Sequence, residues 1–320
     1  MREALFVKQN SEKWQHYESV RQANPDEVAN QFIEITNDLA YAKTFYPNSK
    51  TTAYLNGLAS KLHQAVYKNK KEKSNRFIHF WKTELPVLFF EHRKQIYYAL
   101  IFFLVSCAIG ALSAKYDDTF VRLIMGDDYV NMTNENIAKG DPFGVYKQSN
   151  EFLMFTQIGL NNIYVALYTF VLGIIFSFGS IVSLFRNGVM LGSFQYFFFS
   201  KGLGLQSVLV IWIHGTLEIS AIVLAGAAGL VLGNSFLFPK TYTRMESVIK
   251  GAKDGLKMVL GLVPIFIVAA FLESFVTRHT EMPIYLSVFI LTMSAIFIIW
   301  YVFIYPVKII KKLSYNDREN

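Results

Sequence analysis

The chain has 320 residues, of which 52% are hydrophobic and 17% charged, whereas soluble domains carry roughly 25% charged residues. Its apolar residues fall into blocks of the ~20 residues that cross a bilayer, which excludes an ordinary soluble domain and predicts an all-α polytopic membrane helix bundle. The net charge of +7 does not point to nucleic acid, since the excess Lys and Arg flank the apolar blocks, and the single cysteine, Cys107, excludes an internal disulfide.

Residues 1–74 are predicted to form a small helical cytoplasmic domain. Apolar residues recur there at spacings of three and four, which is typical of amphipathic helices. One such set is followed by a second after Pro47: Val28, Phe32, Ile35, Leu39 and Ala42, then Leu55, Leu58, Leu62 and Val66. A bundle of this size has a thin core, so we expect it to lean on the membrane or a partner.

Residues 75–95 are predicted to form an amphipathic helix in the lipid interface. The apolar side chains of FIHFWKTELPVLFF gather on one side, with Lys and Arg around them: Phe77, Phe80, Trp81, Leu85 and Leu88. The alternative is that this segment packs on the soluble bundle.

The transmembrane bundle is predicted over residues 96–310, with about six spans, the third of them short. The expected spans are 96–114, 159–182, 187–200, 205–236, 258–276 and 284–306. An acidic external loop at about 115–151 separates the first two, and residues 311–320 form a cytoplasmic tail. The alternative for 187–200 is a re-entrant segment.

Basic clusters set the expected orientation, because Lys and Arg near span ends favour the cytoplasmic side. Such clusters precede the first span, fill the loop at 240–257 and follow the last span. Six spans place all three clusters in the cytoplasm, together with both termini. A re-entrant third segment would instead turn the loop at 240–257 outward.

Two ionisable residues lie inside the fourth apolar block, IWIHGTLEISAIVLAGAAG. His214 and Glu218 are four residues apart and share one helix face. The same face continues through small residues that allow another helix to approach closely: Ala221, Ala225, Gly229 and Gly233. This polar pair is therefore expected to point into the protein, because a carboxylate facing hydrocarbon costs at least ~2.5–3.5 kcal/mol.

A second glutamate, Glu273, lies in the fifth span at a depth from which it could reach His214. These three residues form the predicted intramembrane polar site. Arg186, Asn161 and Asn162 are candidate supporting residues, although Arg186 also fits a cytoplasmic anchor and the asparagines also fit a helix cap.

No enzyme signature accompanies this site. The GxSxG, HExxH and P-loop patterns are missing from the sequence, and HGTLE alone supplies too few donors for a tight zinc site. We therefore expect no catalytic residue, no metal and no cofactor.

The runs RNGVMLGSF, HGTLEISAIVLAGAAGLVLG and AAFLESFVT resemble the stage II sporulation protein M family of bacterial and archaeal membrane proteins. FVKQNSEKW, DLAYAKTFYP and the YKNKK region are similar to its longer members. The namesake is a membrane anchor or scaffold for a peptidoglycan-degrading complex in spore engulfment. It is shorter and lacks a soluble region like 1–95, so the resemblance implies a longer, non-sporulation member in the bacterial or archaeal cell (inner) membrane.

Two functions follow as expectations. The first is a membrane scaffold or anchor subunit of a cell-envelope complex, in which the polar site fixes helix packing. The second is a proton-linked transporter or lipid flippase, in which His214, Glu218 and Glu273 share a proton. The expected partners are the lipid bilayer, other membrane or envelope proteins and further copies of this chain, and not nucleic acid.

Overall fold

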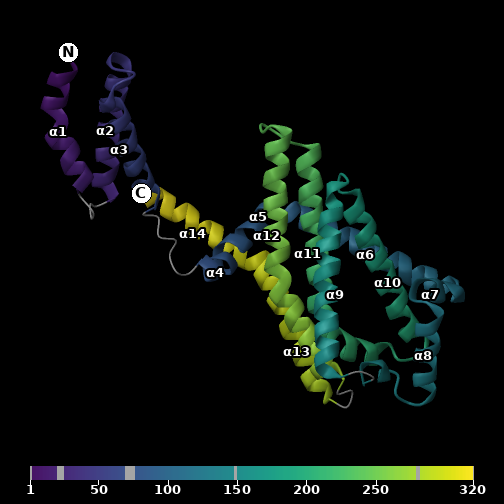
Figure 1. The fold of residues 1–320 in the computed structure, drawn as a ribbon. Helices are drawn as coiled ribbons and strands as arrows, with labels where there is room; N and C mark the ends of the chain where they lie inside the picture. Colours follow the sequence, from purple (N-terminus) through teal and green to yellow (C-terminus); the bar gives the residue numbers. More distant parts are fainter. Residues whose placement is uncertain (1, 20–24, 69–75, 148–149, 279–281, 320) are drawn as a thin grey trace. The chain divides into compact units, whose positions relative to one another are not determined.

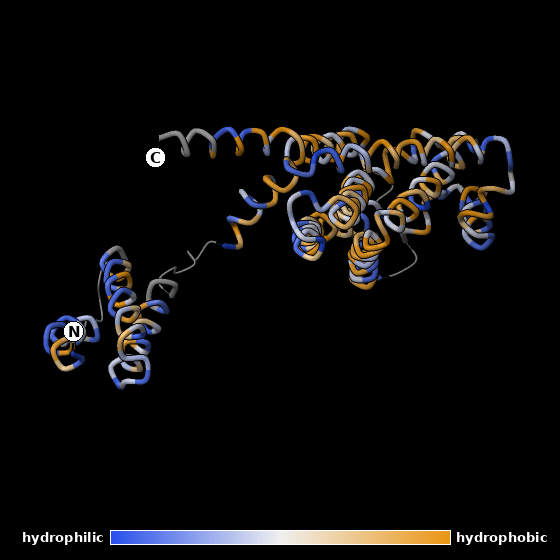
Figure 2. The backbone as a smooth tube through the Cα atoms, turned by 90° about the horizontal axis from the view of Figure 1, so that it is seen from above, coloured by the Kyte–Doolittle hydropathy of each residue, from blue (hydrophilic) through white to orange (hydrophobic). Residues whose placement is uncertain are grey.

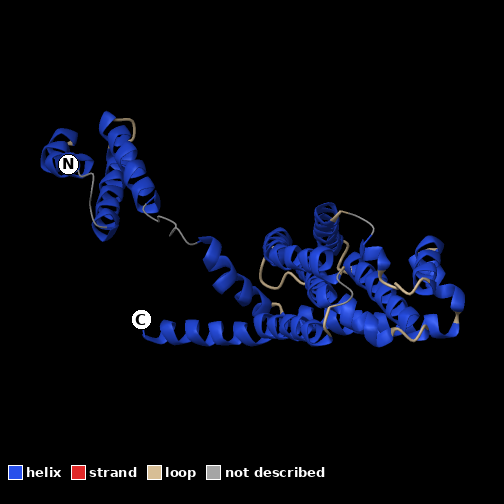
Figure 3. Cartoon of the chain, turned by 90° about the horizontal axis from the view of Figure 1, so that it is seen from below, coloured by secondary structure: helices blue, strands red, loops and turns tan. Residues whose placement is uncertain are grey.

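The structure is a computed structural model that describes residues 2–19, 25–68, 76–147, 150–278 and 282–319. Every regular element in these ranges is a helix (Figure 3). The chain divides into two compact units, Met1–Arg76 and Phe77–Asn320 (Figure 1). The domain boundary expected between residues 74 and 75 lies outside the described residues.

The first unit consists of three helices around one core. They are α1 (Glu3–Ser19), α2 (Pro25–Phe45) and α3 (Lys50–Lys68). Trp14 is buried in this core, and its indole Nε1 donates a hydrogen bond to Asp38 at 2.8 Å. The predicted periodic residues from Val28 to Leu62 bury their apolar sides here, with Phe32 at the edge. The spacing arises because these helices keep one face in water.

The second unit begins with a segment that packs on its long helices: α4 (Arg76–His79), η1 (Phe80–Glu84) and α5 (Leu85–Glu91). Leu85 is 0% exposed in the main core. The Trp81 indole donates to the Gly261 carbonyl at 3.1 Å, and Tyr301 donates to the Trp81 carbonyl at 2.7 Å. The apolar residues that were expected to face lipid therefore have two different environments. Leu85 and Leu88 are buried against the helices, whereas Phe77 is 74% exposed.

The unit is built from long apolar helices, which stand out in hydrophobic colours in Figure 2. Among the residues that the structure describes, five helical stretches are long and apolar enough to cross a membrane: Arg93–Tyr116, Glu151–Ile174, Gly204–Leu237, Arg244–Thr277 and Ile284–Leu313. They comprise α6 (Arg93–Tyr116), α9 (Glu151–Val171) with η3 (Leu172–Ile174), α11 (Gly204–Leu237), α12 (Arg244–Phe271) with η4 (Leu272–Thr277), and α13 (Ile284–Ile299) with η5 (Trp300–Ile304) and α14 (Tyr305–Glu319). The expected tail at 311–320 thus continues the last helix.

A sixth helix, α10 (Phe178–Ser200), contains the residues of the short third span expected at 187–200 and begins nine residues earlier, although it is not among the five stretches apolar enough to cross. It has 23 residues and is therefore about 34 Å long. The preceding helix begins at Glu151 and ends at Ile174, earlier than the expected 159–182. The sequence pattern missed the start of α10 because polar residues interrupt it. Ser180 and Ser183 are among them, and both are buried with hydrogen bonds to Thr169.

The packing shows that α10 carries the chain back across the bundle. α9 and α11 are parallel, because Asn162 lies against Glu218 and Thr169 lies against Gly229. α10 connects the end of α9 to the start of α11 along the chain, so it must run antiparallel to both. α6 is parallel to α10, α12 is antiparallel to α11, and α13 runs with α11. The six helices thus alternate in direction within the bundle.

Small residues bring these helices together. Ala221 and Ala225 are fully buried on α11, and Gly229 and Gly233 follow on the same face. A Cβ atom added at Gly233 would meet the backbone nitrogen of Ser177. At Gly229 and Gly233 the stripe thus lies close to α9, η3 and the start of α10.

The segment expected as an acidic loop at 115–151 is a folded helical cap. It contains α7 (Asp118–Met125), α8 (Asp127–Ala138) and η2 (Gly144–Lys147). Phe143 is buried and stacks on Phe198 of α10 with ring centroids 5.5 Å apart. The cap therefore closes the end of the bundle at which α6 ends and α11 begins.

Candidate functional site

The three predicted ionisable residues converge. His214, Glu218 and Glu273 each offer one ligand atom, and these atoms all lie within 4.8 Å of one another. His214 Nε2 is 3.8 Å from Glu273 Oε1. His214 is buried and both glutamates are half-buried, in the half of the bundle nearer the cap. The shared site that the sequence predicted thus exists as a geometric cluster, which we call the polar triad.

Two helices position the triad. α11 presents His214 and Glu218 from successive turns of one face. α12 unwinds into the π-helix η4 over Leu272–Thr277, and this wider turn carries Glu273. π-Helical turns within α-helices occur often at functional sites, because the extra residue redirects side chains. Beyond η4, Arg278 pairs with Glu151 at 2.9 Å and ties the end of α12 to the start of α9.

A threonine that the sequence analysis missed orients the histidine. His214 Nδ1 lies 3.0 Å from Thr277 Oγ1, and Thr277 is 1% exposed. When Nδ1 donates to this hydroxyl, Nε2 carries a lone pair that faces the carboxylate of Glu273. A lone pair and a carboxylate repel each other, and a proton or another cation between them would relieve that repulsion. Thr277 is one turn beyond Glu273 on η4, which is the signal that could have found it.

A polar cavity of about 320 Å³ opens beside the triad. Its lining includes the two glutamates together with Gln157, Asn161 and Asn162 of α9. Asn162 is 4% exposed, and within the described residues its amide nitrogen makes no hydrogen bond of good geometry, although its side chain lies against Glu218. The two asparagines lie inside α9, whose N-cap is Asn150, so they do not cap this helix, and both line the polar cavity.

Comparison with family models identifies two parts of the chain. The family model for Stage II sporulation protein M matches residues 99–278, more than half of the chain. The chain belongs to the stage II sporulation protein M family. A second model, a domain of unknown function (DUF8413), matches residues 4–68, which hold the three helices of the first unit. No curated protein and no solved structure matches the chain.

The stage II sporulation protein M match includes the whole polar triad, Thr277 and the asparagines of α9, and it ends before α13. Arg186 also lies in the matched region but is not part of the site. It is exposed on α10, eight residues after Phe178, and does not line the polar cavity. Its charge therefore does not balance the glutamates.

The triad has the donor types that could also hold a metal ion, with one imidazole and two carboxylates. HGTLE alone has two such donors, and Glu273 supplies the third from another helix. A proton and a divalent cation would compete for these atoms, because both neutralise the carboxylates.

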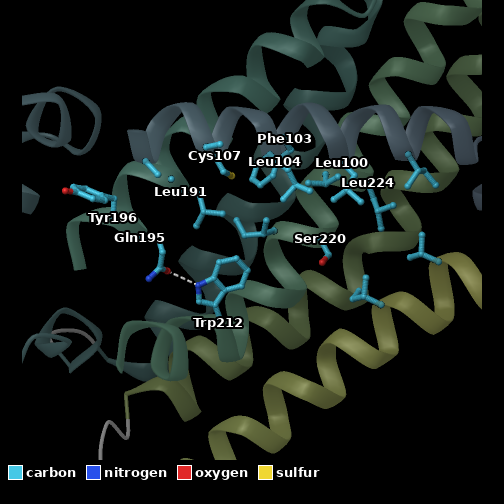
Figure 4. A pocket seen from close by; sticks show the side chains of 18 of the residues that line it. Leu100, Phe103, Leu104, Cys107, Leu191, Gln195, Tyr196, Trp212, Ser220 and Leu224 are labelled. Carbon is cyan, nitrogen blue, oxygen red and sulfur yellow. Dashed lines mark hydrogen bonds between the residues drawn. The ribbon is translucent and has the colours of Figure 1, made fainter. Parts of the chain in front are cut away.

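A second cavity, of about 640 Å³, lies on the other side of α11 (Figure 4). Its walls come from α6, α10, α11 and α13 with η5. Glu218 faces the polar cavity, whereas the next residues, Ile219 and Ser220, face this second one. The helix that carries the triad thus separates a polar space from an apolar space.

Proposed function

We propose that the protein is a proton-linked membrane transporter of the lipid-flippase kind, without catalytic residues. One observation carries the proposal: two carboxylates and an imidazole lie within 4.8 Å beside a polar cavity in membrane-spanning helices. Ionisable groups at such a depth are costly and mark ion or substrate pathways. Two carboxylates this close repel each other when both are ionised, so the triad holds a proton or releases one as its surroundings change.

The arrangement of the helices supports coupling between proton binding and movement. The triad joins α11 to α12, and Asn162 adds α9 to the same cluster. Loss of a proton would leave repelling charges at the point where three helices meet. A shift of these helices relative to one another relieves that repulsion, which is the means by which protonation can drive transport.

Glu218→Gln tests this proposal. The full chain is reconstituted in liposomes with a fluorescent phospholipid, and its transfer between leaflets is followed with and without a pH gradient. We expect the pH gradient to accelerate transfer in the parent and to have no effect on Glu218→Gln or Glu273→Gln, because an amide cannot take up and release a proton.

Glu135→Gln is the matched control, since Glu135 is exposed on α8 in the cap. It should transfer lipid like the parent. Full pH-dependent transfer by a folded Glu218→Gln protein would exclude the proton-linked role.

A second candidate function, a membrane scaffold or anchor for envelope proteins or for further copies of this chain, is favoured by a different observation. Residues 4–68 match a domain family of their own and enclose a separate core. Such a unit suits partner recruitment. In a strain that lacks the gene for this protein, a variant without residues 1–68 would then fail to complement the deletion, whereas Glu218→Gln would complement it. The transport proposal expects loss with Glu218→Gln.

We further propose that the basic ends of the bundle face the cytoplasm of a bacterial or archaeal cell. The end at which α12 begins carries Lys250 and Lys253, whereas the opposite end carries the cap. In a Cys107→Ser background, a cysteine replacing exposed Lys253 should resist a membrane-impermeant thiol reagent on intact cells. A cysteine replacing Glu135 should react. If position 253 reacts and position 135 does not, the topology is the inverse of the one proposed.

A further inference from the structure

The 640 Å³ cavity beside α11 differs from the polar cavity in its chemistry. Its lining is almost entirely apolar and includes Leu100, Phe103, Leu104, Leu191, Val223 and Leu224. Three of its few polar side chains are hydrogen-bonded. Trp212 donates to Gln195 at 2.9 Å, Gln195 donates to Ser207 at 2.7 Å, and Ser220 donates to the Thr216 carbonyl at 2.7 Å.

The cavity is long as well as apolar. On α6 its lining runs from Ile96 to Ala111, which corresponds to about 22 Å along the helix. Figure 4 shows Gln195 and Tyr196 at one end, Leu100 and Leu224 at the other, and Trp212 between them. The shape thus follows the helices across much of the bundle, with its polar side chains toward the end that the cap closes.

We propose that this cavity binds the hydrocarbon chain of a membrane lipid. Water does not suit most of it, because a buried water needs two to four polar partners and nearly all of the lining is apolar. The cavity is partly open to the surroundings of the helices, and its apolar lining gains dispersion contacts when an apolar molecule fills it. The lining helices α6, α11 and α13 are membrane spans, so lipid chains are the apolar molecules that surround them.

The volume agrees with this occupant, since pockets of about 300–1,000 Å³ hold small-molecule ligands. The chain would lie parallel to the spans, as lipid chains lie in a bilayer. Three of the lining residues, Ile298, Val302 and Phe303, come from α13 and η5, which lie outside the family match. The lipid site stands independently of the proposed proton-linked transport, because it requires no titration of the polar triad.

Trp212 provides the reporter for a test. Brominated lipid chains quench tryptophan fluorescence on contact, and Trp212 is one of four tryptophans in the chain. The full-length protein in detergent micelles is titrated with a phosphatidylglycerol that carries brominated chains. We expect saturable quenching in the parent and its loss in Trp212→Phe, which keeps an apolar ring at the same place.

Two further variants fill the cavity. Ala108→Phe and Leu104→Phe both add volume at the lining and should weaken saturable quenching about tenfold. Val105→Phe is the control, since Val105 is exposed on the same helix and does not line the cavity. Size-exclusion chromatography checks that each variant is folded.

The proposal is overturned if quenching rises linearly without saturation, which indicates contact at the protein surface only. It is also overturned if Trp212→Phe or a folded cavity-filling variant is quenched like the parent. Glu218→Gln should retain the saturable quenching, so loss of transport and loss of lipid binding can be distinguished.

Discussion

Replacing Gly229 with leucine is expected to destabilise the bundle by at least the roughly 1–3 kcal/mol that overpacking costs. A Cβ atom at this position would meet the hydroxyl of Ser180 and lie 2.9 Å from the carbonyl oxygen of Thr169. That hydroxyl and carbonyl are hydrogen-bonded to each other at 2.6 Å. The obstruction thus includes backbone and a buried hydrogen bond, and neither can move aside without separating α9, α10 and α11.

Gly215→Ala is the matched control for this prediction, because Gly215 is also buried on α11. No heavy atom lies within 4 Å of a Cβ added there. Alanine should be tolerated and can stabilise the helix by up to about 1 kcal/mol. Thermal unfolding of both purified variants measures the difference. If Gly229→Leu melts at the temperature of the parent, the small-residue stripe faces lipid and the assigned packing face is wrong.

Leu85→Ala is expected to lower the free energy of unfolding by about 2–5 kcal/mol. Leu85 is fully buried, and its side chain lies over Gly261 of α12. Truncation would leave a cavity between α5 and α12, because the nearby hydrogen bond from Trp81 to Gly261 holds the two segments at a set distance. Unfolding in a denaturing detergent, followed by circular dichroism, gives the free-energy difference.

Phe77→Ala serves as the comparison within the same segment. Phe77 is exposed to its surroundings, so its truncation should change stability by no more than about 0.5 kcal/mol. Equal effects of the two substitutions would mean that the segment is not docked on α12. It would then lie in the lipid interface along its whole length, as its amphipathic pattern first suggested.

Several features of the fold were predictable because they depend on local periodicity. The spacing of Ile35, Leu39 and Ala42 predicts the helix that buries them, since one face of that helix contacts water. Long apolar blocks predict the spans for a similar reason, because a bilayer core requires about 20 apolar residues. The start of α10 was missed because Ser180, Ser183 and Arg186 lower the apolar character of that helix. Only packing against α9 shows that both serines find their partner in Thr169.

The sequence predicted which residues form the polar triad, but it did not predict the residues that contact them. His214 and Glu218 are one turn apart on one helix, and the depth of Glu273 follows from the rise of 1.5 Å per residue. The distances from Thr277 and Asn162 depend on how η4 and α9 rotate about their own axes, which sequence spacing does not specify.

The sequence by itself therefore determined that this is a helical membrane protein of the stage II sporulation protein M family, with an ionisable cluster inside the bundle. Composition and helical periodicity are properties of neighbouring residues, and they suffice for that result. The tertiary structure alone decided the direction of α10 within the bundle, the docking of Leu85 and the apolar cavity. Each of these depends on side chains far apart in the chain: Ile96, Leu191 and Phe303 line one cavity because helix packing places them together.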